Sequence, residues 1–576
     1  MKIINRIPPE LLDAVNDFSK RLEWARRLPI YEIHKWWARR LSGIVRLFLL
    51  FAYMDYGTLN KIDDYSSFVE KLYFNPPKVQ NKRLLDPFCG GGTIIIEASN
   101  LGYEAHGIEI NKLACLILKI LKILPSLDLK YMKRKIIEVF DTISNIWVTR
   151  CSKGHRAIII HTFLAWKDET GNIQIRINKI KEGKEKIYYC EKCNTLFTSD
   201  LELENCKQCG NIFNKPYRKI KYSSLWPFAI EYFCPCCNER SFKLMDTFDY
   251  KSFQLQVLNN RLFPIPRLNE TMRLIKAGFM DFGELLTPRQ LFTFNKFLDS
   301  FQEEPYKSVA KLLVSDSLRC CSLLAYYSNR YTKVIPSFVI KSYWLPAQPV
   351  ELNPLSFYLE HEQIFPLGRG NIISGLRKLE RAQKFIQIER LKMDFKVYCG
   401  PAQEIIEELK GKYDIVFTDP PYGDYQFYSD LSLLSLSVLR ELDSQYVQSL
   451  LEKEITLRSS SDLDRYKNSL MRVFSALLRR LSNEGMILLT FHHHNLDLIF
   501  TILSIFKELG LNLYAIYPVM GESSGNLVKR KIYLDLLFVF GFKRERTYFT
   551  YTKHILTKYD ALLQDSIIKI IDFYES

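Results

Sequence analysis

The sequence lacks a hydrophobic run long enough to cross a membrane. Its longest apolar stretch near the N-terminus, Leu47–Tyr53, is well short of the about 20 residues that a spanning helix needs. The opening residues, MKIINRIPPE, contain no apolar core of a secretory signal. Internal repeats and low-complexity tracts are absent as well. We therefore expect a cytoplasmic globular protein without a membrane partner.

The composition excludes several further classes of protein. Of the 576 residues, 47% are hydrophobic and 25% are charged, which rules out a disordered tail, a collagen and a disulfide-stapled miniprotein. The 80 Lys and Arg against 64 Asp and Glu leave a net charge of +16, which favours a polyanionic partner. Disulfides are rare in the cytoplasm, so clusters among the 13 cysteines indicate metal binding.

Two stretches of the chain, one before residue 125 and one after residue 394, predict alternating strands and helices. Such alternation predicts an α/β fold with a largely parallel, doubly wound sheet, and the last two strands predict an antiparallel edge. The expected strands are Arg83–Leu85, Glu104–Glu109, Lys396–Cys399, Tyr413–Thr418, Met486–Phe491, Tyr514–Tyr517 and Ile532–Phe540, and the expected helices are Thr93–Asn100, Lys112–Leu124, Gln403–Leu409, Leu463–Leu481 and Asp497–Leu509.

A glycine-rich turn, LLDPFCGGGT at Leu84–Thr93, follows the first expected strand and opens a helix. Its three glycines remove side chains where a ligand approaches the backbone, and the helix start offers free N–H groups. The turn has the F-x-G-x-G form of methyltransferases that use S-adenosyl-L-methionine (AdoMet). The candidate cofactor-binding residues of this turn are Asp86, Phe88, Gly90, Gly92 and Thr93.

The next expected strand ends in an acid, Glu109. A carboxylate at this place can accept hydrogen bonds from both ribose hydroxyls of a bound nucleoside. Together with Asp86 before the turn, Glu109 favours a nucleoside cofactor over a plain tight turn, and a dinucleotide site is the alternative.

The second motif is TDPPY at Thr418–Tyr422, directly after an apolar strand. An exocyclic amino group on a base is a poor nucleophile, because its lone pair is delocalised into the ring. Asp419 and the carbonyl of Pro420 can accept its two N–H bonds and steer the lone pair toward a methyl donor. Pro420 and Pro421 restrict the backbone so that this carbonyl points inward, and Tyr422 offers a flat face for stacking the base. The alternative is a Pro-Pro turn after a buried strand.

These motifs resemble those of the DNA amino-methyltransferases, which make N6-methyladenine or N4-methylcytosine. More narrowly, HKWWARR at His34–Arg40, the cysteine pairs and TDPPYGDYQFYSDLS resemble the DUF1156-type adenine-specific DNA methylases that contain a zinc ribbon. The motif order is similar to the alpha group of these enzymes, in which the insert reads the DNA target. The resemblance implies a Rossmann-like class I methyltransferase fold, AdoMet as the cofactor, and double-stranded DNA whose target base is flipped out.

The resemblance divides the chain into three parts. Residues 1–125 form an N-terminal cap and the AdoMet-binding half of the methyltransferase domain. Residues 126–393 form an insert with a zinc ribbon and a nucleic-acid-recognition region, and residues 394–576 form the catalytic half. One departure leaves the identity of the base open: Cys399–Gly400 stands where many relatives carry an acid.

In the resembling enzymes an N-terminal segment packs over the methionine end of AdoMet. Here Lys35 could pair with the methionine carboxylate, and Trp36 could lie against the sulfonium. An amphipathic helix that buries its Trp residues is the alternative. Arg39 and Arg40 could equally contact phosphate.

The cysteines predict two zinc sites. Two C-x2-C pairs separated by twelve residues form a zinc-ribbon pattern, and a further C-x2-C pair with a distant C-x3-H predicts a second, nested site. Four protein ligands leave no open position, so the zinc is expected to be structural. The alternatives are unrelated buried cysteines, or a ribbon that only holds the fold or a partner protein. The candidate ligands are Cys190, Cys193, Cys206 and Cys209 for the first site and Cys151, His155, Cys234 and Cys237 for the second.

Four more segments are candidates for substrate contact. Lys215–Tyr222 interleaves basic and aromatic residues, and a solvated strand is the slightly favoured alternative to nucleic-acid contact there. Phe491–Asn495 (FHHHN) ends a strand near the expected substrate rim. Helices near 279–290 and 315–330 are candidates for target reading.

Adenine N6 methylation of DNA is the leading hypothesis, with cytosine N4 as the close alternative. Two further hypotheses are guanine N2 methylation of tRNA and a catalytically inactive nucleic-acid-binding protein. Protein glutamine methylation prefers Asn before the two prolines, so Asp419 argues against it. The sequence leaves open whether a nuclease makes the protein part of a restriction or phage-defence system.

Overall fold

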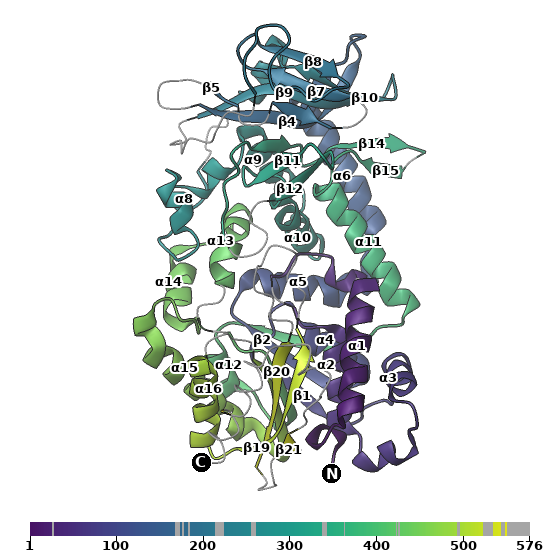
Figure 1. Ribbon diagram of the computed structural model, residues 1–576, viewed down its shortest axis with the longest axis vertical. Coiled ribbons are helices and arrows are strands. Elements are labelled where there is room, and N and C mark those ends of the chain that lie inside the picture. The colour runs from purple at the N-terminus through teal and green to yellow at the C-terminus, as the bar shows by residue number, and fades with distance from the viewer. Residues whose placement is uncertain are drawn as a thin grey trace.

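The structure is a computed structural model. It describes residues 1–25, 28–37, 39–167, 173–175, 178–182, 185–213, 224–254, 261–336, 342–361, 363–421, 423, 427–491, 496–521, 534–542, 548–549 and 569. Figure 1 shows an elongated molecule with a large sheet at the lower end and a second group of strands at the upper end. Each helix in the described ranges is too short or too polar to span a bilayer.

The large sheet has eight strands in the order β16-β2-β1-β17-β18-β20-β19-β21. The run from β16 to β18 is parallel, and β20 lies antiparallel to both of its neighbours. The predicted doubly wound α/β sheet with an antiparallel edge is therefore confirmed. The strands are β1 (Arg83–Asp86), β2 (Glu104–Glu109), β16 (Phe395–Cys399), β17 (Tyr413–Thr418), β18 (Leu481–Phe491), β19 (Asn512–Met520), β20 (Leu534–Gly541) and β21 (Tyr548–Phe549).

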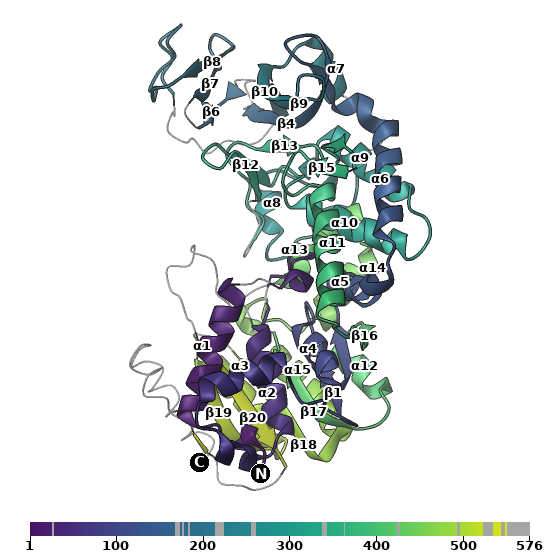
Figure 2. The same ribbon diagram turned by 90° about the vertical axis from the view of Figure 1, so that its right-hand side faces the viewer.

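Helices cover both faces of this sheet, as a parallel sheet requires. Side chains alternate along each strand, so Leu84 packs in one hydrophobic core and Leu85 in the core on the other face. In β17, Phe417 packs in the same core as Leu84, and Val416 packs in the same core as Leu85. Figure 2 shows helices on either side of the strands. The helices of this part are α1 (Pro9–Ala25), α2 (Ser42–Tyr53), α3 (Tyr65–Phe74), α4 (Thr93–Leu101), α5 (Lys112–Ile123), α12 (Ala402–Glu408), α15 (Leu463–Arg480) and α16 (Leu496–Glu508).

The insert has its own strands. A six-stranded sheet contains β3 (Val148–Arg150), β4 (Arg156–Lys167), β5 (Ile173–Gln174), β9 (Ser224–Cys234), β10 (Glu239–Leu244) and β13 (Val350–Leu352), and a three-stranded sheet contains β6 (Lys179–Lys181), β7 (Lys186–Cys190) and β8 (Thr195–Ser199). Two hairpins are formed by β11 (Ala325–Ser328) with β12 (Lys333–Pro336) and by β14 (Phe357–Glu360) with β15 (Gln363–Pro366).

Long helices join the insert to the large sheet (Figures 1 and 2). The three-part division at residues 125 and 393 stays a prediction. The remaining helices are α6 (Leu129–Ile143), α7 (Thr247–Phe253), α8 (Met272–Lys276), α9 (Pro288–Asp299), α10 (Tyr306–Leu318), α11 (Ile372–Ile388), α13 (Tyr428–Val438) and α14 (Ser444–Lys453).

Of the two segments expected to form target-reading helices, 279–290 contains the start of α9 and 315–330 contains the end of α10. Helix α10 ends at Leu318, and residues 325–328 form strand β11 instead of continuing a helix. Arg289 of α9 is fully buried, and its guanidinium pairs with the buried carboxylate of Glu351. Arg289 is therefore not available for contact with a base, and target reading by the other residues of these segments stays a prediction.

Candidate active site

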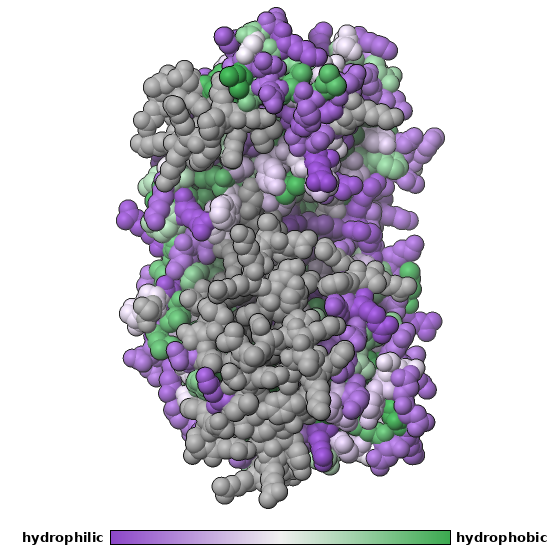
Figure 3. Space-filling model, in the orientation of Figure 1, coloured by the Kyte–Doolittle hydropathy of each residue, from purple (hydrophilic) through white to green (hydrophobic). Residues whose placement is uncertain are grey.

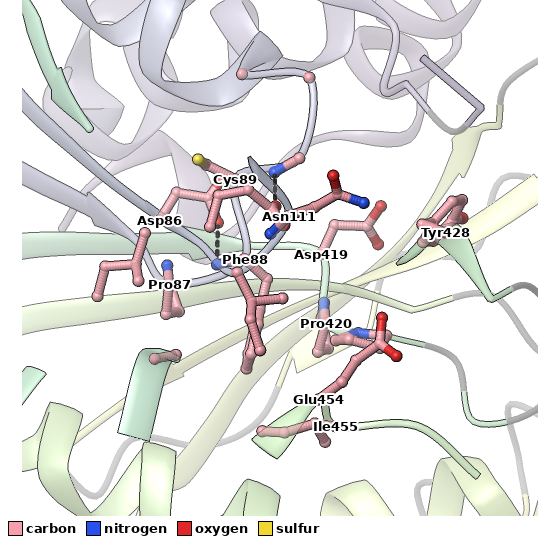
Figure 4. A pocket seen from close by; sticks show the side chains of 18 of the residues that line it. Asp86, Pro87, Phe88, Cys89, Asn111, Asp419, Pro420, Tyr428, Glu454 and Ile455 are labelled. Carbon is pink, nitrogen blue, oxygen red and sulfur yellow. Dashed lines mark hydrogen bonds between the residues drawn. The ribbon is translucent and has the colours of Figure 1, made fainter. Parts of the chain in front are cut away.

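The glycine-rich turn and the TDPPY motif lie side by side at the carboxyl edge of the large sheet. Their strands, β1 and β17, are adjacent and parallel. The hydroxyl of Thr418 donates a hydrogen bond to Oδ1 of Asp86 at 2.9 Å, which joins the tips of the two strands. The strand order reverses at β1, and ligands bind doubly wound sheets at such points. Asp86 and Asp419 accordingly line one pocket (Figure 4).

The glycine turn is shaped by backbone that most residue types rarely adopt. Gly90 and Gly92 have φ angles of 48° and 82°, in the left-handed region. A Cβ at Gly90 would meet the indole Nε1 of Trp36 at 2.9 Å, so the missing side chain also lets Trp36 approach the turn. Gly92 caps α4, whose first residue, Thr93, lies on the pocket wall.

Trp36 contacts both motifs. Its ring stacks on the ring of Tyr428 with centroids 5.9 Å apart, and Tyr428 opens α13 after the TDPPY loop. Trp36 therefore closes the pocket from the side of the N-terminal segment. This segment is not an amphipathic helix here, because α2 begins only at Ser42.

Glu109 is held in place by two backbone amides. The N–H of Gly90 donates to its Oε2 and the N–H of Asn111 to its Oε1, both at 2.8 Å. A carboxylate has about four acceptor positions, so two remain for the hydroxyls of a ribose. Burial raises the pKa of Glu109 to about 7, although these two amide donors oppose the rise.

The wall beside β16 contains no acid at its tip. Gly400 donates its N–H to the carbonyl of Glu109 at 2.8 Å, and the pocket wall continues with Pro401 and Ala402. Another acid, Glu454, lines the pocket from the end of α14 and is 8% exposed. Burial raises the pKa of Glu454, and the nearby guanidinium of Arg458 opposes this shift.

The carboxylate of Asp419 is bound by an arginine from the N-terminal segment. Arg40 donates from Nε to Oδ2 at 2.8 Å and from Nη2 to Oδ1 at 2.5 Å, and the hydroxyl of Thr490 donates to Oδ1 at 3.1 Å. The guanidinium of Arg40 also forms an ion pair with the buried Asp535 of β20. Burial raises the pKa of Asp419, whereas Arg40 and Thr490 lower it.

Most of the predicted site residues of the two motifs share this pocket. Lys35 does not, since it is absent from the lining residues, and Arg39 and Arg40 of the same segment lie there instead. The ring of His34 bonds to the carbonyl of Lys35 and to the hydroxyl of Ser315, which fixes how the segment faces the pocket. The predicted residues that line it are Trp36, Asp86, Phe88, Gly90, Gly92, Thr93, Glu109, Asp419, Pro420 and Pro421.

Three sequence predictions lie outside the described residues: Tyr422, the segment Lys215–Tyr222 and the histidines 492–494. Conversely, sequence reasoning missed the acid Glu454, which carries no local motif. It also did not foresee that Arg40 would pair with Asp419, although Arg40 belongs to a segment singled out for its charge.

The structure brings each predicted set of metal ligands together. The ligand atoms of each set lie within 4.8 Å of one another. The Sγ atoms of Cys190 and Cys209 are 3.5 Å apart, and those of Cys193 and Cys206 are 3.7 Å apart. Tetrahedral zinc with bonds of about 2.3 Å places its sulfur ligands about 3.8 Å apart, so the first set fits this ion.

The second set joins the loop after β3 to the turn between β9 and β10. The Sγ atoms of Cys151 and Cys237 are 4.0 Å apart, and Nδ1 of His155 is 3.2 Å from Sγ of Cys237. Cys234 completes the four. Both sets lie in the insert, among strands at the end of the molecule away from β1 and β17 (Figure 2). This position fits a structural role.

Residues 78–159, which contain β1, α4, β2 and α5, match a family model described as UPF0020, RMKL-like, methyltransferase domain. The eight-stranded sheet and its helices form a class I AdoMet-dependent methyltransferase domain. The glycine turn, the acceptors of Glu109 and the pocket suit AdoMet as its cofactor. No curated protein matches the chain.

Several solved structures share limited similarity with the chain. Precorrin-8w decarboxylase from Methanobacterium thermoautotrophicum is 11% identical with a TM-score of 0.15, and the match covers 29% of this chain and 64% of that one. TrmN from Thermus thermophilus is 12% identical with a TM-score of 0.15, and the match covers 29% of this chain and 33% of that one. Precorrin-6y C5,15-methyltransferase from Geobacter metallireducens GS-15 is 15% identical with a TM-score of 0.14, and the match covers 28% of this chain and 61% of that one. The chain covers less than two thirds of each of them, and TM-scores this low do not bear on activity.

Proposed function

We propose that the methyltransferase domain methylates an exocyclic amino group of a DNA base, with adenine N6 as the first candidate. The observation that supports this most is the shared pocket of Glu109 and Asp419. One wall carries acceptors for the ribose of the cofactor, and the opposite wall carries the Asp-Pro-Pro sequence whose oxygens can accept the N–H bonds of an amine. The net charge of +16 fits a polyanionic substrate.

The residues of the pocket suggest how each group acts. AdoMet, when bound, supplies an electrophilic methyl group. Asp419 accepts an N–H of the target amine, and the hydroxyl of Tyr466 donates to the carbonyl of Pro421 at 2.6 Å, which fixes the loop. Arg40 and Thr490 favour the ionised, accepting form of Asp419. Positioning and these fixed dipoles then supply most of the rate acceleration.

The partner in this proposal is double-stranded DNA with the target base flipped into the pocket. Cytosine N4 and guanine N2 present the same two N–H bonds to Asp419 and the Pro420 carbonyl, so these acceptors alone do not select among bases. Long-read sequencing of DNA from a host that expresses the protein gives the modified base and its context together. N6-methyladenine at a defined site, absent from a host with the Asp419→Ala variant, is the expected result. Unmodified DNA together with newly methylated RNA would overturn the DNA assignment.

A further inference from the structure

An exposed tryptophan of the insert, Trp344, lies next to a residue that contacts α13, the helix after the TDPPY motif. Trp344 is 57% exposed, although its neighbour Tyr343 is only 1% exposed. The hydroxyl of Tyr343 donates to the carbonyl of Asp430 at 2.8 Å, and Asp430 follows Tyr428 of the pocket wall by two residues. Tyr343 thus anchors the backbone next to Trp344 to α13, a helix whose first two residues line the pocket.

A second segment of the insert is anchored at the same place. The N–H of Glu270 donates to Oδ2 of Asp430 at 3.1 Å, and the amide of Asn269 donates to the carbonyl of Arg458 at 3.0 Å. Arg458 in turn pairs with Glu454, which lines the pocket. The segment around Asn269 is therefore held against α13 and the residues after α14, two parts of the chain that contribute to the pocket wall.

Three cations project from this segment. Arg267, Arg273 and Lys276 are all exposed, and the guanidinium of Arg273 lies 4.7 Å from the centre of the Trp344 ring. Within the described part of the chain, no carboxylate forms an ion pair with any of the three. We call Arg267, Arg273, Lys276 and Trp344 the basic ledge.

The chemistry of the basic ledge matches a nucleic-acid strand. Single strands are bound by cations that contact phosphates and by aromatic rings on which bases stack. A guanidinium behind an indole ring also strengthens such a stack. Among the coloured residues of Figure 3, hydrophobic residues form small groups between hydrophilic ones.

We propose that the basic ledge holds the strand next to the target base, with one base stacked on Trp344 and phosphates bound by Arg267, Arg273 and Lys276. This inference rests on the proposed function, since it names the contact that presents the substrate to that pocket. In this proposal exposed residues of the insert present the strand to the pocket. Arg289 of the same insert is buried and cannot take part.

The test measures binding of fluorescein-labelled single-stranded DNA, duplex DNA and RNA of one sequence by fluorescence anisotropy. Trp344→Ala should weaken binding at least about fivefold, and Trp344→Phe should restore most of it, because base stacking needs a flat ring. Phe248→Ala is the matched control, since Phe248 of α7 is an exposed aromatic (46%) of the insert. Calorimetry with AdoMet verifies that each variant is folded.

The proposed phosphate contacts of the basic ledge are tested through the salt dependence of nucleic-acid binding. Losing one phosphate contact lowers the slope of log K against log salt by about 0.7 to 0.9, so Arg273→Ala should lower it by about that amount. Arg134→Ala is the control and should leave this slope unchanged, because Arg134 is an exposed arginine of α6, a helix that lies apart from α8 in both views. The probe whose binding falls most identifies the DNA or RNA source of the strand.

The outcomes separate this proposal from the proposed function. If Trp344→Ala binds all probes as Phe248→Ala does, or if the unaltered protein binds none of them, the basic ledge is not a nucleic-acid contact. If Trp344→Ala weakens binding while no base is ever methylated, the basic ledge stands and the proposed function fails.

Discussion

The guanidinium of Arg40 donates two hydrogen bonds to the carboxylate of Asp419, which lies 379 residues later in the sequence. The same guanidinium pairs with Asp535, so one cation serves two buried carboxylates. Bidentate pairs of this kind are strong and directional. The N-terminal segment thereby becomes part of the pocket, and in our proposal it supports the carboxylate that accepts the N–H of the target amine.

The first prediction concerns Arg40. Without its guanidinium, burial raises the pKa of Asp419 further, and a protonated Asp419 is a poor acceptor. We expect Arg40→Ala to lower kcat/KM roughly 100-fold at pH 7, as loss of a catalytic electrostatic contact often does. We expect part of the activity to return as the pH is raised, and Arg40→Lys to retain more activity than Arg40→Ala.

The measurement is kcat/KM across the pH range, with AdoMet affinity as the control for folding. Removing one member of a buried pair is also destabilising, so thermal unfolding is followed in parallel. An Arg40→Ala enzyme with full activity and an unaltered pH profile would show that Arg40 does not act through Asp419.

The second prediction concerns Asp419. Its carboxylate faces the target amine in our proposal, whereas Glu109 faces the ribose. Asp419→Ala should therefore abolish methyl transfer and change AdoMet affinity only a few-fold. Calorimetry and a tritiated-methyl assay on the same preparation separate the two effects, and equal loss of both would refute the assigned role.

The third prediction concerns the pH dependence of cofactor binding. Burial raises the pKa of Glu109 to about 7, so this group is protonated below that pH and ionised above it. Only the ionised form offers acceptors to both ribose hydroxyls. AdoMet affinity should rise with pH by up to about tenfold per unit below pH 7 and level off above it. The Glu109→Gln variant should bind weakly with a flat profile, and a flat profile in the unaltered protein would contradict the assignment.

The fourth prediction concerns the metal. The two clusters of the insert should hold two zinc ions per chain, measurable by mass spectrometry of the purified protein. Chelation should unfold the insert before the large sheet, because binding of structural zinc is coupled to folding. Cys190→Ser and Cys151→Ser should each lose one ion. A purified protein that is fully folded and contains no zinc would contradict the prediction of a zinc ribbon.

The strands around the pocket could be predicted because local signals specify them. Glu104–Glu109 and Tyr413–Thr418 have the bounds that the sequence predicts, since an apolar run and an acid or a proline mark their ends. Strand β18 begins at Leu481 rather than Met486, because the polar residues between them gave no strand signal.

The pairing of Arg40 with Asp419 could not be predicted in the same way. It depends on how α1, α2 and the sheet pack, and no local pattern encodes such a contact. The same holds for Glu454, which α14 carries to the pocket from outside both motifs, and for Trp344, whose neighbour Tyr343 anchors it to α13.

The most direct test of the central claim is mass spectrometry of nucleosides after incubation of purified protein, AdoMet and unmethylated duplex DNA. Our account predicts N6-methyladenine with the unaltered protein and none with Asp419→Ala. Protein that binds AdoMet but leaves every nucleoside of the DNA unmethylated would contradict it.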